Sequence, residues 1–238
     1  MPLVLKSLIK SNIQYPLRRS FLFIGLCFVL SNAYGQTEEY GLGVGLYGVK
    51  NEYNGDLGSD LLHFSQPWYP AIGLSITTYI SRTFDFGLQG SFGKYGYYKN
   101  TADQFAGLKY DGSLFIHYKL NNGHILKVNS KLSPFFSVGF GFASYTIDPL
   151  LNATIKPINT QGVDFIMPFG IGVKYHVYNS ISIQYQYLYY KTNMDNHDGV
   201  NGLSGNGTVG SDAYGQHILG IIYVFRMPKV FKCKCEYN

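Results

Sequence analysis

The sequence predicts an all-β fold, an eight-stranded antiparallel up-and-down transmembrane β-barrel. Eight segments alternate between large apolar residues and small or polar ones, which is typical of strands with two unlike faces. Aromatic residues make up 17% of the chain and charged residues only 14%, against roughly 25% charged residues in soluble domains. Short and long connections alternate between the segments, as they do in outer-membrane barrels.

The first four predicted strands span about 40–49, 71–81, 84–97 and 108–120. The last of these shows the alternation most clearly, because Leu114, Ile116 and Tyr118 alternate with Phe115 and His117. In the other three, Leu, Val, Ile and Phe oppose Gly, Ser, Thr, Asp and Gln. Each segment therefore has one large apolar face and one face that is small or polar.

The last four predicted strands span about 135–145, 164–177, 180–190 and 214–225. Segment 180–190, "SISIQYQYLYY", alternates Ile and Tyr with Ser and Gln over most of its length. Segment 214–225 is apolar on both faces, so its pattern does not determine which residues point inward.

The small interior of an eight-stranded barrel determines which face points outward. Such an interior has little room for many Phe and Tyr rings, so we expect glycines and polar residues inside and the apolar rows against lipid. A closed barrel also pairs every backbone group within hydrocarbon. A soluble lipocalin-like or sandwich fold with an apolar core would show the same alternation. The glycine-lined face, the unequal connections and the N-terminus favour the membrane barrel.

Residues 1–35 have the features of a secretory signal peptide. An apolar run at 21–30 is followed by the small residues Ala33 and Gly35, and basic residues precede it: Lys6, Lys10, Arg18 and Arg19. The run is too short to span a bilayer as a helix; a buried N-terminal helix or a retained anchor is the alternative. We expect cleavage before Gln36, a barrel over 36–226 and a short periplasmic tail over 227–238.

Removal of the signal peptide would leave 15 basic and 14 acidic residues. This nearly neutral balance gives no basic footprint for nucleic acid. The mature chain would retain Cys233 and Cys235. This C-x-C pair offers fewer ligands than the four that structural zinc needs. We therefore expect no metal and no cofactor.

Several stretches resemble the OmpA-type outer-membrane barrels of Bacteroidetes. They are "YGLGVGLYGVKNEYNGDLG", "PFFSVGFGFASY", "MPFGIGVKYHVYNSISIQYQYLYYKTNMDNHDG" and "HILGIIYVF". The resemblance implies that Gly220, Tyr223 and Phe225 form a signal for the barrel-insertion machinery. Larger members continue into a peptidoglycan-binding domain, whereas this sequence ends thirteen residues after Phe225.

Charged residues on the small, polar faces predict a polar network in the lumen. Its expected members are Asp85, Lys109, Asp111, His117, Lys119, Asp164, Lys174 and His176. Buried charges persist when they are paired, and Asp85 and Lys119 lie near the same ends of neighbouring predicted strands. We expect the network to plug the barrel; gating or a proton relay is the alternative.

The polar connections contain residue types that also occur in catalytic and ion-binding sites. Asp60, His63 and Ser65 share the first connection, and the last contains Asp195, His197 and Asp198. Nothing in the sequence fixes their mutual geometry, so we assign no catalytic residue. "NGDLGSD" and "NMDNHDG" offer oxygen ligands for a divalent cation but lack EF-hand spacing.

These features predict a non-enzymatic, monomeric barrel that stabilises the envelope of a Gram-negative cell and displays its long connections outward. Its expected partners are outer-membrane lipids, lipopolysaccharide and the insertion machinery, and no nucleic acid. The alternatives are a surface adhesin or ligand-binding barrel, a small pore, and a lipid-modifying enzyme.

Overall fold

The computed structural model describes residues 41–55, 58–62, 68–98, 104–148, 161–178, 180–193 and 212–226. Several predictions lie outside these ranges: the signal peptide, the C-terminal tail with Cys233 and Cys235, and His63, Ser65, Asp195, His197 and Asp198. The described residues form strands and turns. They contain no helix of the length and apolarity needed to cross a membrane.

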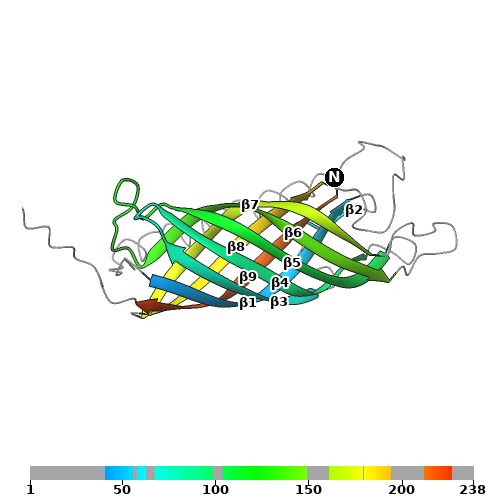
Figure 1. The fold of residues 1–238 in the computed structure, drawn as a ribbon, viewed down its shortest axis with the longest axis horizontal. Coiled ribbons are helices and arrows are strands. Elements are labelled where there is room, and N and C mark those ends of the chain that lie inside the picture. Colours follow the sequence, from blue (N-terminus) through cyan, green and yellow to red (C-terminus); the bar gives the residue numbers. More distant parts are fainter. Residues whose placement is uncertain are drawn as a thin grey trace, which may run out of the picture.

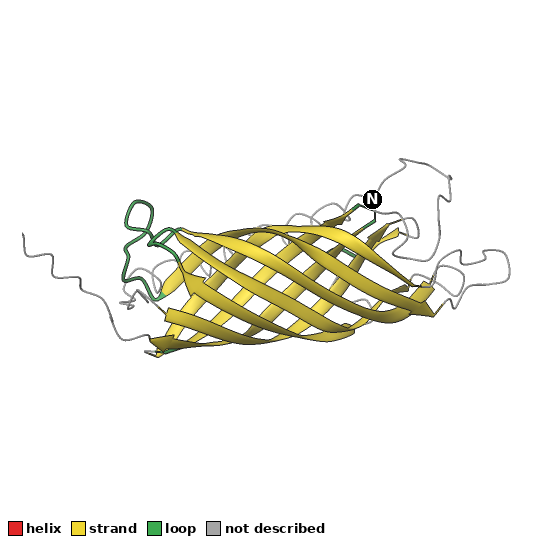
Figure 2. Ribbon diagram, in the orientation of Figure 1, coloured by secondary structure: helices red, strands yellow, loops and turns green. Residues whose placement is uncertain are grey.

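Eight long antiparallel strands close into a barrel (Figures 1 and 2). They are β1 (Gly41–Gly55), β3 (Tyr69–Tyr79), β4 (Phe84–Tyr98), β5 (Gln104–Lys119), β6 (Leu132–Asp148), β7 (Gln161–Tyr178), β8 (Ile181–Thr192) and β9 (Ala213–Arg226). Each strand pairs with the next, and β9 returns to pair with β1 from Gly41↔Arg226 to Asn54↔Ala213. The predicted fold class is confirmed.

The first strand is longer than the sequence pattern predicts, and a short strand follows it. We expected the first strand to end near residue 49. Instead β1 continues to Gly55, since β9 pairs with it as far as Asn54. Beyond Asn51, where its pairing with β3 ends, β1 pairs with β2 (Gly58–Ser59).

The two ends of the barrel differ in their connections. At one end, called here the turn end, the strands are joined by residues 80–83, 120–131 and 179–180. The turn after β5 is stabilised by Asn122, whose Oδ1 accepts hydrogen bonds from the backbone N–H groups of His124 and Ile125. The connections after β1, β4, β6 and β8 leave from the opposite end, called here the loop end.

The outer wall of the barrel is apolar. Leu74, in the middle of β3, is 63% exposed, and Ile181, Ile183 and Tyr185 of β8 point outward as predicted. Other exposed apolar side chains come from every side of the barrel, among them Leu46, Phe86, Leu88, Ile116, Phe140, Ile171 and Leu219. In water this surface would be unfavourable by about 25 cal/mol for each Å² of apolar area, so it fits lipid.

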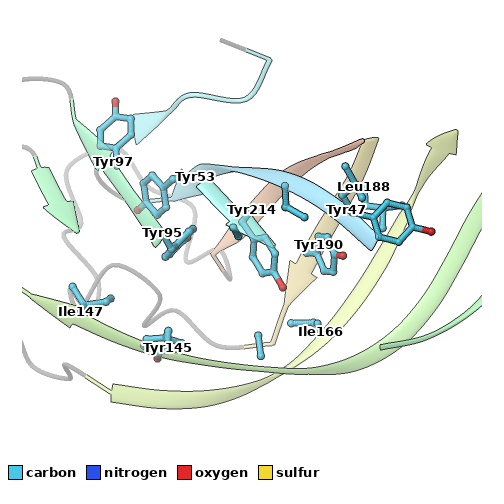
Figure 3. Packing of buried hydrophobic residues seen from close by; sticks show 14 of the residues in the cluster. Tyr47, Tyr53, Tyr95, Tyr97, Tyr145, Ile147, Ile166, Leu188, Tyr190 and Tyr214 are labelled. Atoms are coloured by element: carbon cyan, nitrogen blue, oxygen red, sulfur yellow. The ribbon is translucent and has the colours of Figure 1, made fainter. Parts of the chain in front are cut away.

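The expectation that the lumen has little room for Phe and Tyr rings is wrong at the loop end. A buried cluster fills this part of the interior: Tyr53, Tyr95, Tyr97, Phe105, Tyr190 and Tyr214 (Figure 3). The Tyr190 and Tyr214 rings stack with centroids 4.4 Å apart. Glycines make room for some inward rings. A side chain at Gly58, for example, would overlap Tyr97, and the φ of Gly58 is 140°.

Candidate functional site: the lumen and a polar cluster on the outer wall

The polar residues of the lumen form three levels between the turn end and the loop end. Nearest the turn end, the Nζ of Lys119 on β5 donates a 2.6 Å hydrogen bond to Asp85 Oδ1 on β4. Lys119 also lies over the Tyr79 ring, 4.4 Å from its centroid. The structure therefore brings Asp85 and Lys119 together as an ion pair near the mouth of the barrel.

His117 lies deeper in the barrel, between two aromatic rings. Its ring stacks on Phe115 and on Phe135, with centroids 4.2 Å away on either side. Nε2 of His117 is buried and has no hydrogen-bond partner among the described residues. The imidazole therefore packs here as a flat ring between two aromatic side chains.

The middle of the lumen is crossed by glutamine side chains. Gln186 Nε2 on β8 donates to Gln89 Oε1 on β4 at 2.7 Å, and Gln184 donates to Gln186 at 3.2 Å. In the cyclic strand order β8 and β4 are four strands apart in either direction. The bond between Gln186 and Gln89 therefore joins opposite walls of the barrel.

A second crossing lies toward the loop end. Gln216 Nε2 on β9 donates to Asp111 Oδ2 on β5 at 2.9 Å and to Ser91 Oγ on β4 at 3.0 Å. The ammonium of Lys109 lies 3.3 Å from the Asp111 carboxylate and 3.2 Å from the centroid of the Tyr214 ring. Carboxylate and aromatic face together compensate a fully buried cation.

The remaining predicted lumen residues all belong to β7. Asp164 is fully buried toward the loop end. His176 and Lys174 lie at the turn end, where both line a cavity of about 40 Å³. His176 Nδ1 is 2.9 Å from Ser182 Oγ. Asp85, Lys119, Lys174 and His176 thus gather at the turn end, whereas Lys109, Asp111 and Asp164 lie toward the loop end.

Sequence reasoning missed a polar cluster on the outer wall. Lys50 and Glu52 continue the outward row of β1, and His217 belongs to the outward row of β9. Glu52 Oε1 accepts hydrogen bonds from Lys50 Nζ at 2.7 Å and is 2.9 Å from His217 Nε2. On the other side of the imidazole, Nδ1 is 2.8 Å from the Tyr185 hydroxyl.

The chain that follows β2 covers this outer-wall cluster. The backbone N–H of Leu62 donates to Glu52 Oε2 at 2.8 Å, and Leu62 has a φ of 61°. A non-glycine residue with positive φ is strained. Tyr187 also hydrogen-bonds Glu52, so both carboxylate oxygens have partners.

We interpret the cluster as a clamp over the seam where β9 closes onto β1. Its carboxylate and imidazole are saturated by contacts within the protein, so it needs no ligand. The sequence did contain a signal for it. Two charges, Lys50 and Glu52, stand in phase with the lipid-facing Leu42, Val44 and Leu46.

Asp60 is the one described residue among the Asp, His and Ser residues that we considered for catalysis, and its contacts are with the backbone. Its carboxylate accepts a hydrogen bond from the Tyr53 N–H, and its own N–H donates to the Tyr53 carbonyl at 3.0 Å. Burial raises the pKa of Asp60 to about 6, and the nearby Glu52 carboxylate adds to the shift. The contacts identify Asp60 as the residue that holds the start of this connection against β1.

The three residues of the expected insertion signal lie on β9. Tyr223 and Phe225 point outward, and their rings pack edge to face with centroids 4.8 Å apart. Gly220 pairs with Tyr47 of β1. A side chain at Gly220 would overlap the Leu46 carbonyl and Tyr47. The close approach of the two strands therefore explains this glycine without reference to any partner.

Among the described residues, no group of three His, Cys, Asp or Glu side chains is arranged to hold a metal ion. No protein-family model and no curated protein matches the sequence.

Several solved membrane barrels resemble the structure. Neisserial surface protein A, from Neisseria, is 15% identical with a TM-score of 0.49, over 77% of this chain and 97% of that one. Ail, the attachment invasion locus protein of Yersinia pestis, is 12% identical with a TM-score of 0.48, over 79% and 99%. OprG of Pseudomonas aeruginosa is 11% identical with a TM-score of 0.44, over 82% and 100%. The fold assignment itself rests on this chain's own strand pairing.

Proposed function

We propose that this chain is a non-enzymatic β-barrel protein of a Gram-negative outer membrane, with a structural role in the envelope. The observation that carries the proposal is the pair of hydrogen bonds that join opposite walls of the lumen, Gln186 to Gln89 and Gln216 to Asp111. A diffusion pore needs an open, water-filled interior. A barrel crossed at two levels is suited to stabilising the membrane.

The outer wall supports the location in a membrane. Apolar side chains surround the barrel, and every long strand has two hydrogen-bonded neighbours, as hydrocarbon requires. On this proposal the partners are outer-membrane lipids and lipopolysaccharide. Tyr223 and Phe225 would present their exposed rings to the barrel-insertion machinery. The resemblance to OmpA-type barrels of Bacteroidetes and the signal peptide at 1–35 belong to the same proposal.

Single-channel recording of the mature chain in a planar bilayer tests the sealed lumen. We expect no steady conductance of porin size. A variant with Lys109→Ser and Gln216→Ser should conduct more, because it removes an ammonium and an amide that cross or fill the lumen. The control is Lys94→Ser, which removes an exposed cation outside the lumen. Steady conductance of porin size in the unmodified chain would contradict the proposal.

A binding role for the surface connections is the second candidate. It is favoured by the position of the connections after β4, β6 and β8, which all leave the barrel at the loop end. The test is deletion of residues 195–210. Asn193 and Asp212 are retained because they hydrogen-bond Phe165 and Thr192 at the ends of this connection. Weaker attachment of cells to a surface, with normal amounts of folded barrel, would support binding, and unchanged attachment would reject this connection.

A further inference from the structure

The cavity at the turn end is lined by more cationic side chains than carboxylates. The cations Arg82, Lys119 and Lys174 and the imidazole of His176 line it, against one carboxylate, Asp85. We call this cavity the turn-end vestibule. Its volume of about 40 Å³ exceeds the roughly 10–15 Å³ that one water molecule needs on the same measure. The vestibule therefore has room for a small polar ligand.

The single carboxylate of the vestibule is already engaged. Asp85 Oδ1 accepts a 2.6 Å hydrogen bond from Lys119 Nζ, and both side chains are largely buried. Asp85 therefore compensates Lys119, and the vestibule keeps a positive charge from Lys174, with Arg82 exposed at its rim.

Lys174 is the decisive group. It is only 9% exposed, and no hydrogen bond or ion pair joins it to the described residues. A buried ammonium without an anionic partner is costly, so its environment favours a counter-anion. The other lysine buried in the lumen, Lys109, has both a carboxylate and an aromatic face beside it.

Hydrogen-bond donors accompany this ammonium. Asn121 Oδ1 accepts a 2.6 Å hydrogen bond from Ser133 Oγ, which leaves the amide N–H groups of Asn121 for a ligand. His176 is engaged with Ser182 through Nδ1. The vestibule thus combines a positive charge with neutral donors, which is the chemistry that binds oxyanions.

We propose that the turn-end vestibule binds a small oxyanion, a phosphate or carboxylate group, through Lys174 and Asn121. The inference goes beyond the structural role of the barrel and does not depend on it, because it concerns one mouth of the lumen and not its sealed middle. In the test, inorganic phosphate represents phosphate ligands and acetate represents carboxylate ligands.

Calorimetric titration of the folded mature chain in nonionic micelles, at fixed ionic strength, tests the site. We expect saturable binding of inorganic phosphate, acetate or both, and the stronger of the two identifies the preferred group. Lys174→Met keeps an unbranched side chain one atom shorter and removes the charge, so it should weaken binding at least about tenfold, or 1.4 kcal/mol. Lys94→Met, on the outer wall, should bind as the unmodified chain does.

The ligand should also raise the unfolding midpoint of the unmodified chain but not that of Lys174→Met, because an anion that binds only the folded state stabilises it. If Lys174→Met does not fold, Lys174→Arg must retain binding and Asn121→Ala must weaken it. The proposal is overturned if neither anion binds saturably, or if loss of the Lys174 charge leaves binding unchanged. Neither result would contradict the structural role of the barrel, because single-channel recording tests that role separately.

Discussion

Gln216 on β9 donates a 2.9 Å hydrogen bond to the carboxylate of Asp111 on β5, the strand directly opposite in the closed sheet. Neighbouring strands are held by their backbones, but opposite strands meet only through side chains. This contact therefore adds a constraint on the shape of the barrel that strand pairing alone does not supply.

Replacement of Gln216 by Ala should destabilise the barrel. The change removes the donor that serves Asp111, Ser91 and Asn51. Asp111 and Ser91 still hydrogen-bond each other, but the buried Asn51 Oδ1 loses the bond from Gln216, at about 1–3 kcal/mol for an unsatisfied buried group. Urea unfolding in lipid vesicles measures the effect, with Gln161→Ala, an exposed residue of β7, as the control. Equal unfolding free energies for the two variants would show that the crossing contributes nothing.

The outer-wall cluster should hold the connection after β2 in place. Glu52→Gln removes the negative charge that Lys50 and His217 share and breaks the buried ion pair with Lys50, a loss of up to about 3–5 kcal/mol. Amide exchange at Leu62, whose N–H donates to Glu52, should become faster. NMR in micelles measures it, with Lys94→Gln as the control. Unchanged exchange and unfolding free energy would refute the clamp.

Asp60 should make the loop end more stable in mild acid. Its pKa is raised from 3.8 to about 6, chiefly by burial, so the folded state binds the proton more tightly than the unfolded state does. Stability should therefore rise as the pH falls from about 6 to about 4. The charges of Glu52 and Lys50 also act on this carboxyl, and the carboxylate in turn interacts electrostatically with Tyr69.

The side-chain carbon shift of Asp60, followed by NMR, should titrate with a midpoint near pH 6. Asp60→Asn, which keeps an acceptor for the Tyr53 N–H, should remove this part of the pH dependence. A midpoint near 4 would mean that Asp60 is solvated and does not hold the connection.

Gly220 should be required for folding even without the insertion machinery. Ala at this position would overlap the backbone of β1, whereas Ala at Gly112 would meet nothing within 4 Å. In refolding into detergent micelles, Gly220→Ala should therefore give little folded protein and Gly112→Ala a near-normal yield. Equal yields would reject the steric explanation and leave recognition by the machinery as the reason for this glycine.

The alternation of residue types was enough to predict the fold and the outward face of most strands, because period 2 in a barrel fixes which side meets lipid. The loop end could not be predicted in this way. Tyr53, Tyr95 and Tyr214 occupy inward positions, and their burial depends on rings from several strands meeting in the lumen. The role of Glu52 could not be predicted either, because its partners other than Lys50 come from β8, β9 and the chain after β2.

For the lumen too, the sequence could predict contacts between neighbouring strands but not contacts across the interior. Asp85 and Lys119 could be paired from the sequence because they lie at neighbouring strand ends. The contacts of Gln216 and Gln186 could not, since they join opposite walls, and pairing between adjacent strands says nothing about which side chains meet across the interior.

Quenching of tryptophan fluorescence by lipids brominated in their acyl chains tests the orientation of the wall most directly. Trp68 is the one tryptophan of the sequence, so Trp68→Phe combined with Leu74→Trp places a single reporter at an exposed position in the middle of β3. We expect strong quenching in brominated vesicles, because this position should lie within the hydrocarbon. A reporter that the bromines do not quench, in a chain that remains folded and monodisperse without detergent, would contradict the account.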